Sequence, residues 1–88
     1  MYVKVVGQGA ERTLRVRIRV SRPARAQLKL VVAGVSRLQK SSAVKGGTND
    51  LKASVPSSVA KGAAQVRITL KDPTGRVKTY RSPVVVPA

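Results

Sequence analysis

The segment LRVRIRV, Leu14 to Val20, alternates strictly between apolar and basic side chains. Its apolar residues fall at positions 14, 16, 18 and 20, and its arginines at 15, 17 and 19. Because successive side chains of a β-strand point to opposite faces, this period of two predicts a strand over 13–21 with one buried face and one basic face. The basic face has two alternative roles, keeping a strand soluble or holding an acidic partner.

The same alternation recurs along most of the chain and predicts further strands. Together with 13–21, the segments concerned are 2–6, 26–34, 51–56, 65–71 and 76–86. For 35–50 two readings stay open: a short strand or edge followed by a turn at KGGTND, or a helix over 35–45, which its Val and Ser residues disfavour. About seven short strands with turn signals every 8–12 residues predict an antiparallel β-sandwich, with a small β-barrel as the alternative.

Turn residues separate these strands. GQGAE (7–11) reads as a turn, RPAR (22–25) as a tight link, and SSVAKGAA (57–64) as a connection with room for one helical turn. DPTG (72–75) has Asp first, Pro second and Gly last, the signature of a type I turn. It predicts a hairpin between the strands on either side.

Length and composition bound the molecule. The chain of 88 residues suits one domain, 1–88, without cysteine and with only two tyrosines as aromatics, so the core must be aliphatic. No apolar run approaches the ~20 residues that span a membrane, and no signal-peptide core opens the sequence. An extracellular or cell-surface location is expected if the chain is excised from a larger protein, and a cytoplasmic or virion location otherwise.

The charge is extreme and spread along the sequence. Lys and Arg number 18 against three acids, Glu11, Asp50 and Asp72, for a net charge of +15. At least fifteen cations, Arg15, Arg17 and Arg19 among them, are therefore expected to have no acidic partner within the chain. Because unpaired like charges destabilise a small domain, this excess favours contact with an acidic polymer or an acidic protein surface.

Enzymatic chemistry is not expected. The chain has no His and no Cys, which removes the commonest general bases, thiol nucleophiles and zinc ligands. GQGAER (7–12) starts like a phosphate-binding loop but lacks a third glycine, and the Ser–Lys pairing in KSS (40–42) is common on surfaces. We therefore expect no catalysis, no cofactor and no metal site.

Three stretches carry a family resemblance: LRVRIRVSRPARAQLKLVV (14–32), LKASVPSSVAKGAAQVRITL (51–70) and KDPTGRVKTY (71–80). Their order resembles the immunoglobulin-like and fibronectin-type-III-like domains of bacterial surface and secreted proteins. Ala63 or Ala64 stands where that family usually has a corner tyrosine. The resemblance implies a sandwich that acts as a spacer, an adhesin or a carbohydrate-binding accessory rather than as an enzyme.

Two basic stripes are the candidate binding residues. The first follows the opening segment, and the second is expected to point outward from the third strand and the last hairpin. In the resembled topology the two stripes lie on different sheets, so both outer faces would be basic. The candidate polyanion-binding residues are Arg15, Arg17, Arg19, Lys29, Arg67, Lys71, Arg76 and Lys78.

Three functions follow as hypotheses. The first is a structural or adhesion module whose basic faces contact an acidic polymer, such as a glycan, a wall polymer or a nucleic acid backbone, or an acidic assembly. The second is an assembly subunit, such as a virion decoration or filament protein, using the apolar run Val84, Val85 and Val86 for self-assembly. The third is non-specific nucleic-acid binding, for which the shortage of aromatics excludes extensive base stacking.

Overall fold

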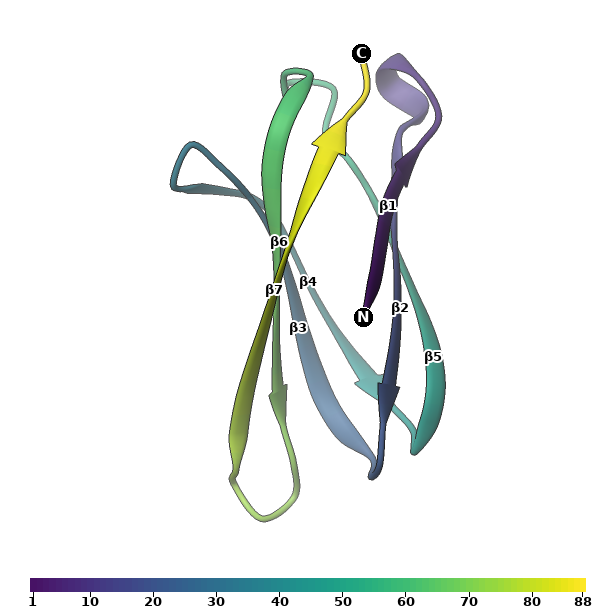
Figure 1. The fold of residues 1–88 in the computed structure, drawn as a ribbon, viewed down its shortest axis with the longest axis vertical. Coiled ribbons are helices and arrows are strands. Elements are labelled where there is room, and N and C mark those ends of the chain that lie inside the picture. Colours follow the sequence, from purple (N-terminus) through teal and green to yellow (C-terminus); the bar gives the residue numbers. More distant parts are fainter.

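The strands form two antiparallel sheets in a computed structural model that describes residues 1–88 (Figure 1). The three-stranded sheet has the order β1 (Tyr2–Val6), β2 (Thr13–Val20), β5 (Gly47–Ser54). The four-stranded sheet has the order β4 (Val35–Val44), β3 (Ala24–Val32), β6 (Gly62–Lys71), β7 (Val77–Val86). The prediction of an all-β antiparallel sandwich is confirmed.

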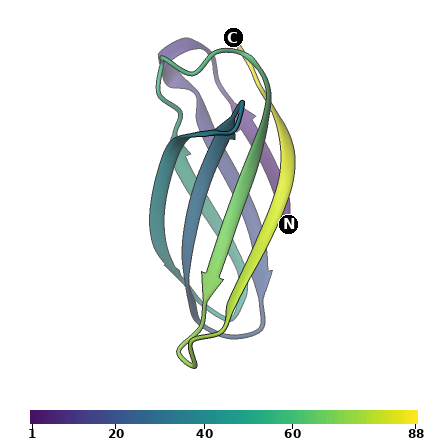
Figure 2. The same ribbon diagram turned by 90° about the vertical axis from the view of Figure 1, so that its left-hand side faces the viewer.

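The core lies between the two sheets and consists of aliphatic side chains. Leu14, Val16 and Ile18 of β2 are buried, as the alternation of the opening segment predicts. They belong to a cluster of 16 buried residues, against which Tyr80 packs partly buried. Figure 2 shows the four-stranded sheet in front of the three-stranded one, with the strands of both running along the long direction of the molecule. Burial of the apolar half of each strand is the main force that holds the sheets together.

In the middle of the chain the strand interpretation of 35–50 is confirmed, with a longer strand and a shorter turn than predicted. Residues 35–44 form one ten-residue strand, so the helical reading is wrong, and β5 begins at Gly47, inside the predicted turn. Leu38 and Val44 of β4 face the core side, which gives the strand two apolar anchors. The connection shrinks to Lys45 and Gly46, because the side-chain amide of Asn49 donates to the Lys45 carbonyl (2.7 Å) and accepts from its N–H (3.0 Å).

Two of the other predicted connections are shorter than predicted, because β3 begins at Ala24, inside 22–25, and β6 begins at Gly62, inside 57–64. A three-residue 3₁₀ turn, η1 (Gly9–Glu11), lies within 7–11, whereas 57–64 contains a single turn, in which the Val59 N–H donates to the Pro56 carbonyl (3.0 Å), and no helix. The hairpin at 72–75 is confirmed, with the Gly75 N–H donating to the Asp72 carbonyl (3.0 Å). Loops therefore lie only at the two ends of the sandwich and leave both outer faces open.

The β3–β4 hairpin bends away from the body of the sandwich, as Figure 1 shows. Its register shifts between Leu30 and Val31, and Ala33 and Gly34 at its tip have positive φ angles of 51° and 80°. Two central residues with positive φ suit the twist of a two-residue hairpin turn. The shift in register is a β-bulge, and bulges bend the strand that carries them.

Candidate basic binding faces

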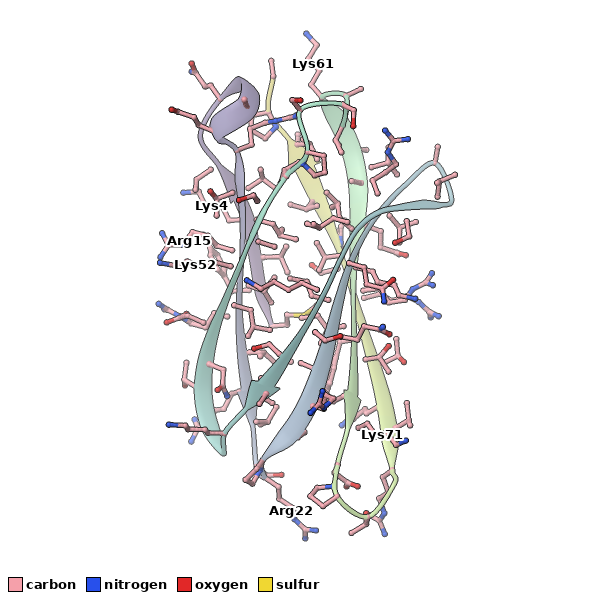
Figure 3. All side chains as sticks on the ribbon, turned by 180° about the vertical axis from the view of Figure 1, so that it is seen from behind. Lys4, Arg15, Arg22, Lys52, Lys61 and Lys71 are labelled. Carbon is pink, nitrogen blue, oxygen red and sulfur yellow. The ribbon has the colours of Figure 1, made fainter.

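The outer surface of the three-stranded sheet, here called the three-strand face, carries a row of cations. The cross-strand register places Lys4 of β1, Arg15 of β2 and Lys52 of β5 directly beside one another. Figure 3 shows these three side chains together on the outer side of that sheet. Neighbouring strands are about 4.8 Å apart, so three positive charges lie within one short row. Like charges in directly opposed positions destabilise a sheet.

The next row of this face contains an ion pair that contradicts the expectation from sequence. Arg17 lies opposite Asp50, and its Nε donates to Asp50 Oδ1 at 2.9 Å. The hydrogen bond from Arg17 is the main cause that lowers the pKa of Asp50, and it raises the pKa of Arg17. The expectation that Arg17 has no partner within the chain is therefore wrong. Both side chains are more than half exposed, 63% and 55%, so the pair contributes little to stability.

The outer surface of the four-stranded sheet, here called the four-strand face, carries two rows of cations. The first row runs from Lys29 of β3 to Arg67 of β6 and Arg81 of β7. The second row places Arg25 of β3 beside Lys71 of β6. No carboxylate lies in either row or between them. The prediction that Lys29, Arg67 and Lys71 lie on one sheet, and the arginines of the opening segment on the other, is confirmed.

Lys78 does not belong to this face, which corrects the prediction. It lies opposite Leu70, a core residue, so its backbone position is on the inner side of β7. It nevertheless reaches solvent, because it lines an open hollow at one end of the sandwich. There its ammonium lies 5.1 Å from the centre of the Tyr80 ring.

Two cations of the four-strand face were missed in the sequence, although a signal for each was present. Tyr80, Val84 and Val86 of β7 face the core, so the odd-numbered residues of this strand point outward. Arg81 is one of these odd-numbered residues. Arg25 falls within the predicted link 22–25, but in β3 it lies on the same side of the strand as Lys29. Applying the alternation to both ends of each strand would have found them.

Arg76 lies at one end of the sandwich rather than on an outer face. Its N–H donates to Asp72 Oδ1 at 3.0 Å, and the same carboxylate oxygen accepts from the N–H and the hydroxyl of Thr74. The hydroxyl of Thr74 is the main cause that lowers the pKa of Asp72. With Arg19 and Arg22, Arg76 lines an open hollow of about 610 Å³. Arg19 thus lies at the margin of the three-strand face.

The apolar run of the last strand is divided between core and surface. Val84 and Val86 are buried in the core, while Val85 between them is 73% exposed. The strict alternation of β7 explains this division, since Val85 lies opposite Ala63 on the outer side. A self-assembly surface made by all three valines is therefore wrong, and only Val85 is available for contact.

One arginine forms a site that was not predicted from the sequence. Arg12 is only 3% exposed and is the one buried charged side chain. Its guanidinium donates to four backbone carbonyls, those of Gly9 (2.8 Å), Pro87 (3.0 Å), Pro56 (3.0 Å) and Val59 (2.7 Å). It thereby joins η1, the β5–β6 loop and the C-terminal segment. No pattern in the sequence separates this arginine from its exposed neighbours.

Fold and charge together define the class of protein as a small all-β antiparallel sandwich with two basic outer faces. The structure contains no helix long and apolar enough to cross a membrane. Comparison with known protein families, with curated proteins and with solved structures found no significant match to this chain.

Proposed function

We propose that this chain is a non-catalytic, immunoglobulin-like binding module whose basic outer faces contact an acidic polymer or an acidic protein assembly. The observation that carries the proposal is the lateral alignment of like charges. Each outer face places three cations side by side on three adjacent strands, and Asp50 is the only carboxylate on either face. Opposed like charges destabilise a sheet, and an anionic partner would relieve that repulsion.

The proposed relation to immunoglobulin-like and fibronectin-type-III-like domains is supported by strand order. β1, β2 and β5 form one sheet while β3, β6 and β7 belong to the other, as the first, second, fifth and the third, sixth, seventh strands do in such sandwiches. The fourth strand pairs with the third, whereas in antibody constant-type domains it pairs with the fifth. Domains of this architecture commonly serve as structural or adhesive modules, which agrees with a binding role without catalysis.

Equilibrium binding tests the proposal. A fluorescently labelled heparin oligosaccharide and a labelled duplex DNA are titrated with the protein at several salt concentrations between about 50 and 200 mM. We expect the logarithm of the binding constant for at least one polymer to fall steeply and linearly with the logarithm of the salt concentration. The reason is that Lys and Arg side chains that bind a polyanion release its counterions. Absence of measurable binding to both polymers at the lowest salt concentration would contradict the proposal.

Self-assembly is the second candidate function, and the exposed Val85 on the edge strand β7 supports it. Sedimentation analysis over a range of protein concentrations tests it with the variant Val85→Ser. A mass above that of the monomer, reduced by this substitution, would support an assembly subunit. A monomer at all concentrations would contradict this second function and leave polymer binding unaffected.

A further inference from the structure

The four-strand face differs from the three-strand face in what lies between its cations. A row of uncharged polar side chains separates its two cation rows. The row runs across all four strands, from Ser41 of β4 to Gln27 of β3, Thr69 of β6 and Thr79 of β7. The hydroxyl oxygens of Thr69 and Thr79 lie 3.5 Å apart, and both threonines keep capacity for further hydrogen bonds.

The spacing of the rows suits an extended chain rather than one small anion. Arg25 and Lys29 are four residues apart on β3, which corresponds to about 13 Å along the strand. The polar row lies midway between them. A ligand that contacts both cation rows must therefore cross hydroxyl and amide groups on the way.

The centre of the face is formed by Arg67, whose neighbours in its row are both cations. It is half-buried, and its Nε is buried without a hydrogen-bond partner in the protein. Beside it, the bent β3–β4 hairpin borders a groove of about 460 Å³, with Lys29, Gln65 and Ser36 among its lining residues. The groove lies on the side of Lys29 and Arg67 away from the polar row, and its lining adds an amide and a hydroxyl to these two cations.

We propose that the four-strand face binds an anionic polysaccharide, with sulfate or carboxylate groups on the two cation rows and sugar hydroxyls on the polar row between them. This inference rests on the proposed polymer-binding function and assigns it a face and a ligand class. Hydroxyl and amide side chains both donate and accept hydrogen bonds, as sugar hydroxyls do. Single-stranded nucleic acids instead require aromatic platforms, and Tyr80 packs on the inner side while Tyr2 belongs to the other sheet.

Two charge-matched double variants test the face. Lys29→Glu with Arg81→Glu reverses two cations of the four-strand face, and Arg15→Glu with Lys52→Glu reverses two cations of the three-strand face. Both variants have the same net charge, so any difference in binding reflects position. We expect the first variant to bind the heparin oligosaccharide about tenfold or more weakly than the second, because direct charge contacts are local.

Substitutions in the polar row test the ligand class. Gln27→Ala with Thr69→Val removes hydrogen-bonding groups without changing the charge, and Thr48→Val on the three-strand face is the matched control. We expect the double variant to bind heparin about three- to tenfold more weakly while its affinity for duplex DNA and its salt slope stay unchanged. Circular dichroism and urea unfolding confirm that each variant is folded before binding is compared.

The outcomes separate the inference from the function on which it rests. A larger loss from the three-strand variant, or equal losses from both charge variants, would overturn the assignment of the face. Equal losses of heparin and DNA binding in the polar-row variant would overturn the polysaccharide and favour unspecific polyanion binding. In each of these cases the proposed function stands. Only failure of the unmodified protein to bind either polymer would contradict that function itself.

Discussion

Arg12, just before β2, and Arg15, within β2, lie three residues apart, and their surroundings are opposite. Arg12 is buried, and four backbone carbonyls accept hydrogen bonds from it. Arg15 is exposed between two further cations, Lys4 and Lys52. The first charge is satisfied inside the fold and stabilises it, whereas the second forms no hydrogen bond or ion pair within the chain and is available to a partner. A cation therefore does not need a carboxylate to be structural.

The largest effect is expected from removing the buried guanidinium. Arg12→Ala leaves carbonyls of three separate segments without their donor, and we expect a loss of about 3 kcal/mol or more in the free energy of unfolding. Urea unfolding followed by circular dichroism measures it. Arg22→Ala, at an exposed position of the β2–β3 turn without hydrogen bonds from its side chain, is the matched control and should change stability by less than about 0.5 kcal/mol.

Arg12→Lys makes the same test if the alanine variant does not fold. An ammonium keeps the charge but cannot reach four carbonyls with the planar fork of a guanidinium. We expect stability between those of the unmodified protein and the alanine variant. A lysine variant as stable as the unmodified protein would show that charge rather than geometry joins the three segments.

Gly7 tests the same end of the molecule through the backbone. Its φ angle is +90°, and a Cβ at this position would lie 2.3 Å from the carbonyl oxygen of Glu11. Gly7→Ala should therefore displace η1 and weaken the hydrogen bonds of Arg12, at a loss of about 2 kcal/mol. Gly9→Ala is the control, because Gly9 also has positive φ but a Cβ added there would have no atom within 4 Å. Equal losses from the two substitutions would indicate backbone strain alone.

The contrast between Arg12 and Arg15 also marks how far the sequence alone leads. Alternation predicted which face of β2, β3, β5 and β6 is buried, because it depends only on neighbours along the chain. It placed Leu14, Val16 and Ile18 in the core, as observed. The position of Arg12 depends on carbonyls of residues far away in the sequence, at 56, 59 and 87, which no local pattern encodes.

The binding faces were predictable only in part for a related reason. The alternation of side chains along a strand assigns each residue to one face of the sheet. The register between strands decides which charged residues become neighbours. The row of Lys4, Arg15 and Lys52 and the pair of Arg17 with Asp50 both follow from register. The predicted outward position of Lys78 conflicts with the alternation of β7 itself, because Lys78 lies on the same side of that strand as the buried Val84 and Val86.

A smaller effect of opposite sign is expected on the three-strand face. Arg15→Glu replaces two repulsions, with Lys4 and Lys52, by two attractions, and we expect a gain of about 0.5 to 1 kcal/mol in the free energy of unfolding. Added salt should raise the stability of the unmodified protein more than that of the variant, since salt screens exposed charges. Thermal unfolding at several salt concentrations measures both. A loss of stability in the variant would indicate that the repulsion in this row is already negligible.

The smallest effect is expected from the one ion pair, and it depends on pH. The hydrogen bond from Arg17 lowers the pKa of Asp50 in the folded chain, so the pair stabilises the fold at pH values above about 4, the ordinary carboxyl range, and its contribution is lost as the pH falls through the lowered value. Asp72 has a lowered pKa as well and adds to the same acid loss. Asp50→Asn should therefore lose less thermal stability than the unmodified protein between about pH 5 and pH 2.5, with the remaining loss reduced further by Asp72→Asn. If Asp50→Asn has the same acid sensitivity as the unmodified protein, the ion pair has no influence on stability. Arg17 then has no stabilising partner within the chain, like the other exposed cations of the two faces.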